Sequence, residues 1–140
     1  MSEDHSVIFS VADLHRSFRK KGERVLGTAG LTIGQFRVLS ALKREGGLCQ
    51  RDIERECVIS RSGVSGLVDA LEGEGLIVRE RVDSDKRLRR LSLTKGGEER
   101  LNEAEALIKE LDISIEAILG EDEIKGFLGA VGRLIECLGE

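Results

Sequence analysis

The sequence predicts a mainly α-helical chain with one short β-hairpin. Three observations support this: a helical periodicity that recurs from residue 6 to residue 138, two Ile-, Val- and Leu-rich runs on either side of a polar pentapeptide, and a helix directly before them. The 140 residues are enough for one domain with a core of its own. A helix followed at once by a charged hairpin is the arrangement of a winged helix-turn-helix.

The first predicted helix precedes that arrangement. Val7, Val11, Leu14 and Phe18 share one stripe, which predicts a helix over Ser6–Val25. Basic residues near the end of this helix complement its dipole, and this is a sufficient structural explanation for them.

A second helix is predicted to begin after Thr32. Gln35 lies three residues further on, so the two side chains are placed to form a capping box. The buried stripe of this helix comprises Ile33, Phe36, Leu39 and Leu42.

A helix-turn-helix is predicted next. Cys49–Glu56 forms a short helix, and Ser60 caps another one after a turn of the length that helix-turn-helix units use. The apolar residues of this recognition helix recur at intervals of three and four, at Val64, Leu67, Val68 and Leu71. The residues predicted to face base pairs and phosphates are Ser60, Arg61, Ser62, Ser65, Gly66 and Asp69.

The hairpin, or wing, is predicted from strands over Leu76–Val82 and Leu88–Leu93, with a polar turn at Asp83–Arg87. Seven basic and three acidic residues lie between Arg79 and Gly97, although the whole chain has a net charge of −4. This local excess favours contact with phosphates, whereas charge on a hairpin also serves to protect its edges from pairing with other chains. The residues predicted to contact DNA here are Arg79, Arg81, Asp85, Lys86, Arg87, Arg89 and Arg90.

Two amphipathic helices are predicted after the wing, the first capped by Thr94 and the two separated by Gly120. Their heptad-like spacing leaves more apolar surface than one subunit buries, so we expect a homodimer. Twelve acidic and four basic residues in this part predict that it points away from DNA. The predicted organisation is an N-terminal dimerisation helix (1–30), a DNA-binding domain (31–97) and C-terminal dimerisation helices (98–140).

The composition argues against several other classes of protein. No apolar run approaches the roughly 18 residues of a membrane helix, and the first residues lack the features of a secretion signal, so we expect a cytoplasmic protein without disulfides. His5 and His15 are the only histidines, and there is no Cys-x-x-Cys or His-x-x-x-His pair to predict a metal site. No phosphate loop or nucleophile elbow is present, so we expect no enzyme activity and no cofactor.

The stretch from Gly75 to Gly97 carries the most specific motif of the chain. It reads G-L-I-x-R, then a polar turn that ends in D-x-R, then L-x-L-T-x-x-G. With this motif, the helix-turn-helix and the second predicted helix, the chain resembles the MarR family of winged helix-turn-helix transcription regulators. The residues that match the family pattern are Gly75, Leu76, Ile77, Arg79, Asp85, Arg87, Leu91, Leu93, Thr94 and Gly97.

The resemblance implies a homodimeric repressor that binds a pseudo-palindromic operator on double-stranded DNA, with one recognition helix in each of two successive major grooves. It also implies that Arg87 enters the flanking minor groove and that Asp85 holds its side chain, although Asp85 is equally typical of a turn. The family often has basic residues at the position of Gly66 and near Ala70. Since both are missing here, we expect most of the affinity to come from the wing.

Many members of the family release DNA when they bind a small, often phenolic or anionic, molecule, and others respond to oxidation of a cysteine. Phe18 and Phe36 are candidates for lining an effector pocket, although phenylalanines at helical spacing are more typical of a core. Cys49 and Cys57 share an apolar helix face, which favours a buried structural role, and Cys137 is a candidate for oxidation between subunits. The acidic recognition helix keeps a second interpretation open, a winged-helix module that binds protein instead of DNA.

Overall fold

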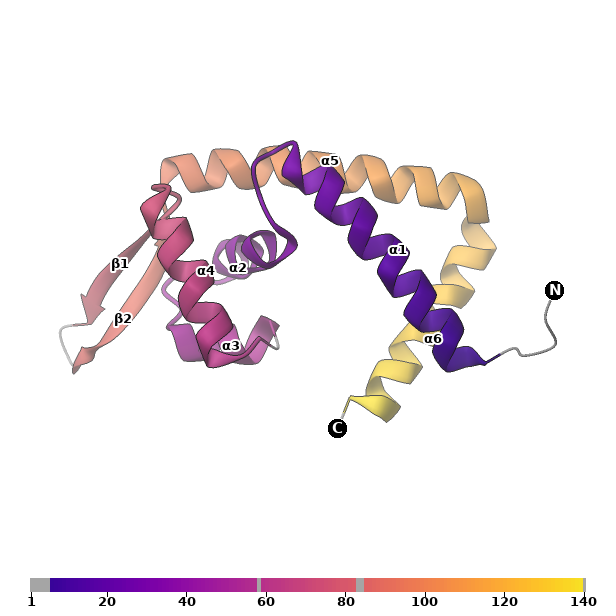
Figure 1. Ribbon diagram of the computed structural model, residues 1–140, viewed down its shortest axis with the longest axis horizontal. Helices are drawn as coiled ribbons and strands as arrows, with labels where there is room; N and C mark the ends of the chain where they lie inside the picture. Colours follow the sequence, from indigo (N-terminus) through magenta and orange to yellow (C-terminus); the bar gives the residue numbers. More distant parts are fainter. Residues whose placement is uncertain (1–5, 58, 83–84, 140) are drawn as a thin grey trace. The chain divides into compact units, whose positions relative to one another are not determined.

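The computed structural model describes residues 6–57, 59–82 and 85–139, and for residues 85–87 it describes no side chains. The chain divides into two compact units, Met1–Ala106 and Leu107–Glu140. The mainly α fold with one hairpin is confirmed, while the division into three functional parts stays a prediction. In chain order the elements are α1 (Val7–Gly27), α2 (Ile33–Arg44), α3 (Gln50–Cys57), α4 (Arg61–Gly73), β1 (Ile77–Val82), β2 (Asp85–Leu93), α5 (Lys95–Leu119) and α6 (Glu121–Leu138) (Figure 1).

Hydrogen bonds from side chains to the backbone begin α2 and α4 where the sequence predicts them. The Thr32 hydroxyl accepts a hydrogen bond from the backbone N–H of Gln35 at 3.1 Å, and the Gln35 side chain accepts one from the backbone N–H of Thr32 at 3.0 Å. This is the predicted capping box of α2. The Ser60 hydroxyl caps α4 by accepting from the backbone N–H of Gly63 at 3.2 Å. Both predicted caps are therefore confirmed.

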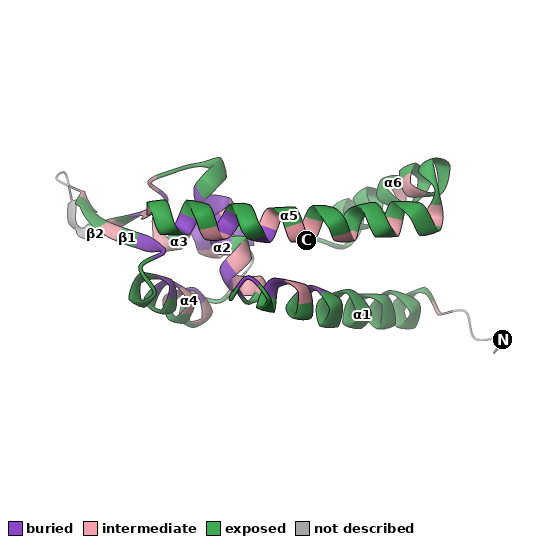
Figure 2. Ribbon diagram, turned by 90° about the horizontal axis from the view of Figure 1, so that it is seen from above, coloured by how far each residue is buried: buried purple, intermediate pink, exposed green. Residues whose placement is uncertain are grey.

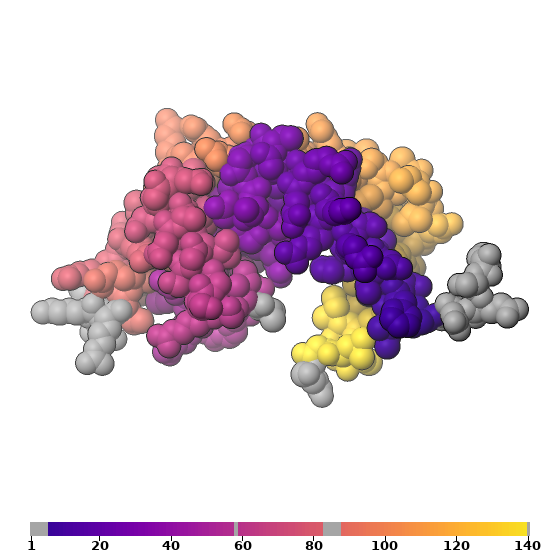
Figure 3. Space-filling view, in the orientation of Figure 1, coloured from indigo at the N-terminus to yellow at the C-terminus, as the bar shows by residue number. Residues whose placement is uncertain are grey.

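The core of the first unit lies between α2, α3, α4 and the wing. Figure 2 shows the buried residues of this region in purple, and Figure 3 shows α4 beside the wing at the left of the view. A short bridge between Leu48 and Leu91 also attaches β2 to the residues before α3. Burial of apolar surface is the main driving force for such packing, so the helix-turn-helix and the wing share one hydrophobic core. Its fully buried side chains include Val38, Leu39, Ile53, Val64, Val68, Leu71, Ile77 and Leu91.

The wing begins its second strand earlier than the sequence predicts. The expected start at Leu88 is wrong, because β2 begins at Asp85, which pairs with Val82 across the antiparallel hairpin. An irregularity of register between Arg81 and Val82 accompanies this extension. The ladder is formed by backbone groups, so the polar residues from Asp85 to Arg87 are compatible with a strand.

The wing joins α5 through a tight junction at Thr94 and Gly97. The Thr94 hydroxyl donates to the carbonyl of Gly75 at 2.6 Å and accepts from the backbone N–H of Gly97 at 3.0 Å, which confirms Thr94 as the cap of α5. The backbone N–H of Thr94 donates to the carbonyl of Leu76 at 3.1 Å. A side chain on Gly97 would overlap that same carbonyl oxygen, so glycine is required for this close approach.

The terminal helices keep large apolar side chains on the surface of the single chain. Figure 2 shows α1 and α6 exposed along most of their length, and α6 buries no residue. Apolar surface of this extent is typical of a protein–protein interface. No helix within the described ranges has the continuous apolar length that crossing a membrane requires. The exposed apolar residues of α1 are Val7, Ile8, Phe9, Val11, Leu14 and Phe18, and those of α6 are Phe127, Leu128, Leu134, Ile135 and Leu138.

Candidate nucleic-acid interface

The outer face of α4 carries the small polar residues that the sequence assigns to DNA. Ser60, Arg61, Ser62, Gly66 and Asp69 are exposed, and Ser65 is half-buried. The opposite face packs into the core through Val64, Val68 and Leu71. The predicted face is therefore open to solvent and available to a DNA major groove, while the individual contacts stay predictions.

Two of the residues that are predicted to contact DNA bind each other. Arg79 of β1 forms an ion pair with Asp69 of α4, and its Nε lies 3.7 Å from a carboxylate oxygen of Glu72. The side chain of Arg79 is only 25% exposed. This cluster of Asp69, Glu72 and Arg79 attaches the wing to the recognition helix. It also neutralises acidic charge that would otherwise face the phosphates of DNA. We therefore expect Arg79 to position the wing instead of contacting DNA itself.

Breaking this cluster is expected to loosen the wing from the recognition helix. In a double-mutant cycle of Asp69→Ala and Arg79→Ala, the two losses in free energy of unfolding should be non-additive. A coupling of about 0.5 kcal/mol is expected, because Asp69 is largely exposed to solvent and screening weakens the pair. Urea denaturation of the wild type, the two single variants and the double variant measures this coupling.

Arg81→Ala is the matched control for that cycle. Arg81 is exposed and lies two residues further along the same strand. The losses caused by Asp69→Ala and Arg81→Ala should therefore simply add. Equal couplings in the two cycles would show that the Arg79 contact does not hold the wing.

The wing also places arginines opposite each other. Arg81 of β1 is the register partner of Arg89 of β2, whereas Glu80 lies opposite Arg90. Like charges directly opposite on a hairpin are unfavourable, so the pairing of Arg81 with Arg89 favours a polyanion as the partner of this surface. The predicted side-chain roles of Asp85, Lys86 and Arg87 lie outside the described residues and stay predictions.

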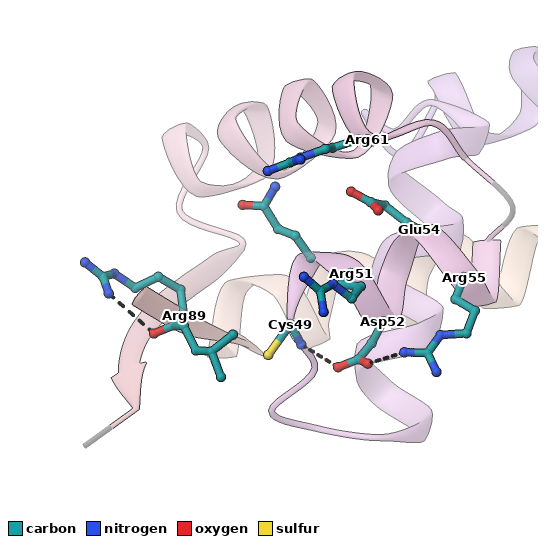
Figure 4. A pocket seen from close by; sticks show the side chains of 9 residues that line it. Cys49, Arg51, Asp52, Glu54, Arg55, Arg61 and Arg89 are labelled. Atoms are coloured by element: carbon teal, nitrogen blue, oxygen red, sulfur yellow. Dashed lines mark hydrogen bonds and ion pairs between the residues drawn. The ribbon is translucent and has the colours of Figure 1, made fainter. Parts of the chain in front are cut away.

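A groove of about 520 Å³ lies between α3, α4 and the wing. Arg51 of α3, Arg61 of α4 and Arg89 of β2 each line it, and Figure 4 shows Arg51 and Arg61 on facing sides. Asp52 also lines the groove, but one of its carboxylate oxygens accepts from the backbone N–H of Cys49 at 2.9 Å and the other pairs with Arg55 at 3.0 Å. The groove is thus polar and rich in guanidinium groups.

Arg51 is absent from the residues that the sequence predicts to contact DNA. It lies ten residues before Arg61, in the helix that precedes the recognition helix. Its place beside the wing depends on the bridge between Leu48 and Leu91, which joins residues 43 positions apart. Hydrophobic periodicity gives no signal for such a contact, so the sequence offers only the residue type as a hint.

The predicted effector residues are not brought together around one cavity. Phe36 lines a cavity of about 310 Å³ with Arg37, Ser40, Arg44, Glu56 and Cys57. Phe18 is not among these lining residues and is 40% exposed on α1. The cavity therefore contains one of the two predicted phenylalanines, and an effector role for either stays a prediction.

The three cysteines differ in their surroundings. Cys57 is buried, and burial raises the pKa of its thiol, which weakens its reactivity as a thiolate. Cys49 is half-buried, and Cys137 is exposed near the end of α6. Within the described ranges, no three His, Cys, Asp or Glu side chains gather in a way that would hold a metal ion.

A polar recognition helix beside a cationic two-stranded hairpin defines a winged helix-turn-helix DNA-binding protein. The chain belongs to the MarR family of these transcription regulators, and the model of that family matches residues 29–88. The family and the class of protein that the wing motif predicts are therefore confirmed. The HTH-type transcriptional regulator FarR of Neisseria gonorrhoeae is 29% identical over 81% of this chain and 80% of FarR. The HTH-type transcriptional repressor MdtR of Bacillus subtilis (strain 168) is 33% identical over 68% of this chain and 61% of MdtR.

Solved structures agree with this assignment. The transcriptional repressor CouR bound to a 23-mer DNA duplex has a TM-score of 0.87 and 28% identity, and the match covers 92% of each chain. CouR bound to p-coumaroyl-CoA has a TM-score of 0.84 and 25% identity, over 92% of this chain and 91% of CouR.

Proposed function

We propose that the protein is a homodimeric repressor that binds a pseudo-palindromic operator on double-stranded DNA and is released by an effector. The observation that carries this proposal is the cationic wing beside the polar outer face of α4. Small polar residues suit close approach to base edges, and the arginines of the wing suit the phosphates beside them. The similar repressor CouR has been solved on a DNA duplex, which supports the same role here.

The apolar faces of the terminal helices support a homodimer. Leu128 and Ile135 lie seven residues apart on α6 and are 60% and 65% exposed in the single chain. Residues seven apart lie on the same side of an α-helix, so a second copy is able to cover both at once. Pairing of identical subunits also matches an operator made of two related half-sites.

A small anionic molecule is the effector that we propose. The cavity beside Phe36 offers an aromatic ring and two guanidinium groups, from Arg37 and Arg44, although Arg44 is also paired with Glu56 at 3.6 Å. CouR has been solved with p-coumaroyl-CoA, an acyl thioester that carries phosphates, which supports an anionic effector. Oxidation of Cys137, which is exposed near the end of α6, is the weaker candidate for the signal.

A winged-helix module that binds protein instead of DNA is less well supported. Its basis is the acidic character of the recognition helix, yet Asp69 and Glu72 are both engaged by Arg79. The helix is therefore less negative toward a partner than its sequence suggests. We further propose that the protein acts in the cytoplasm, has no enzyme activity and needs no cofactor.

A titration with DNA across salt concentrations tests the proposed function. Labelled duplexes that tile the DNA beside its own gene would be compared with a scrambled duplex of the same base composition. One of the tiled duplexes should bind more tightly than the scrambled one, and its affinity should fall by about 10³-fold or more between about 50 and 200 mM salt. If no duplex binds at the lower salt concentration, the protein is not a DNA-binding repressor.

A further inference from the structure

We propose that the groove between α3, α4 and β2 holds a phosphate of the DNA backbone, and that Arg51 is a DNA-contacting residue. This inference rests on the proposed function and adds a site outside the recognition helix and the wing. The ligand is a phosphodiester of duplex DNA, whose charge and geometry suit guanidinium donors.

The position of the groove is the first argument. It lies between Arg61, at the start of the recognition helix, and Arg89, on the second strand of the wing. DNA that contacts both the recognition helix and the wing has to pass the space between them. Figure 4 shows Arg51 reaching into that space from α3, on the side that faces Arg61.

The state of the arginines is the second argument. In the described part of the chain, the guanidinium groups of Arg51 and Arg61 take part in no hydrogen bond or ion pair. Other arginines of the same unit are engaged, for example Arg55 with Asp52 and Arg79 with Asp69. Two cations held without partners around one groove, on a chain of net charge −4, favour an anion as their ligand.

The acidic residues of the groove cancel only part of this charge. The carboxylate of Asp52 is engaged by a backbone N–H and by Arg55. Glu54 is the other acidic residue in the lining, and Figure 4 shows its carboxylate on the side of the groove where Arg61 lies, whereas Arg89 lies toward the opposite end. The lining as a whole has four arginines against these two acidic residues, so the groove keeps an excess of positive charge.

The composition of α4 is the third argument. Arg61 is the one basic residue between Arg61 and Gly73, and its helix also contains Asp69 and Glu72. Arg51 supplies from α3 a positive charge that the recognition helix lacks. A contact to the backbone carries no base information, so this site should strengthen binding to every duplex by the same factor.

Substitution of Arg51 tests the inference. Affinity for the tightest-binding duplex and for the scrambled duplex would be measured by fluorescence anisotropy at several salt concentrations. Arg51→Ala should weaken both complexes by about the same factor, roughly tenfold or more, and should lower the slope of log affinity against log salt by about 2, because each subunit of the dimer loses one phosphate contact. Arg51→Lys keeps the charge, so it should restore the slope even where it does not restore all of the affinity.

Arg16→Ala is the matched control, because Arg16 is an exposed arginine on α1 with an ion-pair partner of its own, Asp13. It should leave both affinities and the slope at their wild-type values. If the wild type binds with a steep salt dependence and Arg51→Ala keeps the same slope, the phosphate site is overturned while the proposed function stands. If the wild type binds neither duplex, the proposed function fails and the phosphate site fails with it.

Discussion

Replacing both Leu128 and Ile135 with glutamate is expected to yield single subunits and to lower operator affinity by about 10²- to 10⁴-fold. The two side chains are largely exposed in the single chain, so the substitutions should leave the fold of the subunit intact. Carboxylates at these positions would be costly to bury against a second copy. A lone subunit binds one half-site and loses the gain in effective concentration that joins the two binding events. Sedimentation and DNA titration measure both effects.

Arg133→Glu is the matched control for this experiment. It also introduces a glutamate into α6, at a position that is exposed and lies off the apolar stripe. This variant should sediment and bind DNA as the wild type does. A double glutamate variant that still sediments as a dimer would show that α6 does not join the subunits.

Replacing Arg87 with alanine is expected to lower operator affinity by about tenfold or more, which corresponds to roughly 1 to 3 kcal/mol for one good contact. A guanidinium group in a narrow, A·T-rich minor groove gains from the concentrated negative potential there. The loss should therefore be greatest for operators whose flanks are rich in A·T pairs. Anisotropy titrations with operators of A·T-rich and G·C-rich flanks measure this difference.

Arg87→Lys, which conserves the charge, and Arg133→Ala, which serves as a control, would be measured beside that variant. Lysine keeps the charge but not the planar fork, so an intermediate affinity is expected. Arg133→Ala removes an arginine from α6, far along the chain from the wing, and should have little effect. A binding curve for Arg87→Ala that coincides with that of the wild type would remove Arg87 from the interface.

The features that the sequence predicts correctly are those with local physical causes. Thr32 and Ser60 begin helices because their hydroxyl groups accept hydrogen bonds from backbone N–H groups three residues later. Gly120 separates α5 from α6 with a φ of 80°, a conformation that favours glycine. Such contacts span a few residues, so their signals are visible in the order of the amino acids.

The features that sequence reasoning misses depend on contacts between elements. Asp69 and Arg79 each look like a separate DNA contact until the packing of β1 beside α4 joins them. Arg51 has no distinguishing pattern until the wing is placed beside α3. The start of β2 at Asp85 is set by pairing with the opposite strand. In each case the deciding partner is supplied by tertiary structure, which propensity does not encode.

The junction at Thr94 and Gly97 couples the position of α5 to that of the wing, which bears on how an effector would release the protein from DNA. The backbone of the first turn of α5 packs directly against the carbonyl of Leu76, because Gly97 has no side chain to separate them. Closely packed atoms pass a displacement on instead of absorbing it. A ligand that tilts the first turn of α5 would therefore displace the start of the wing as well.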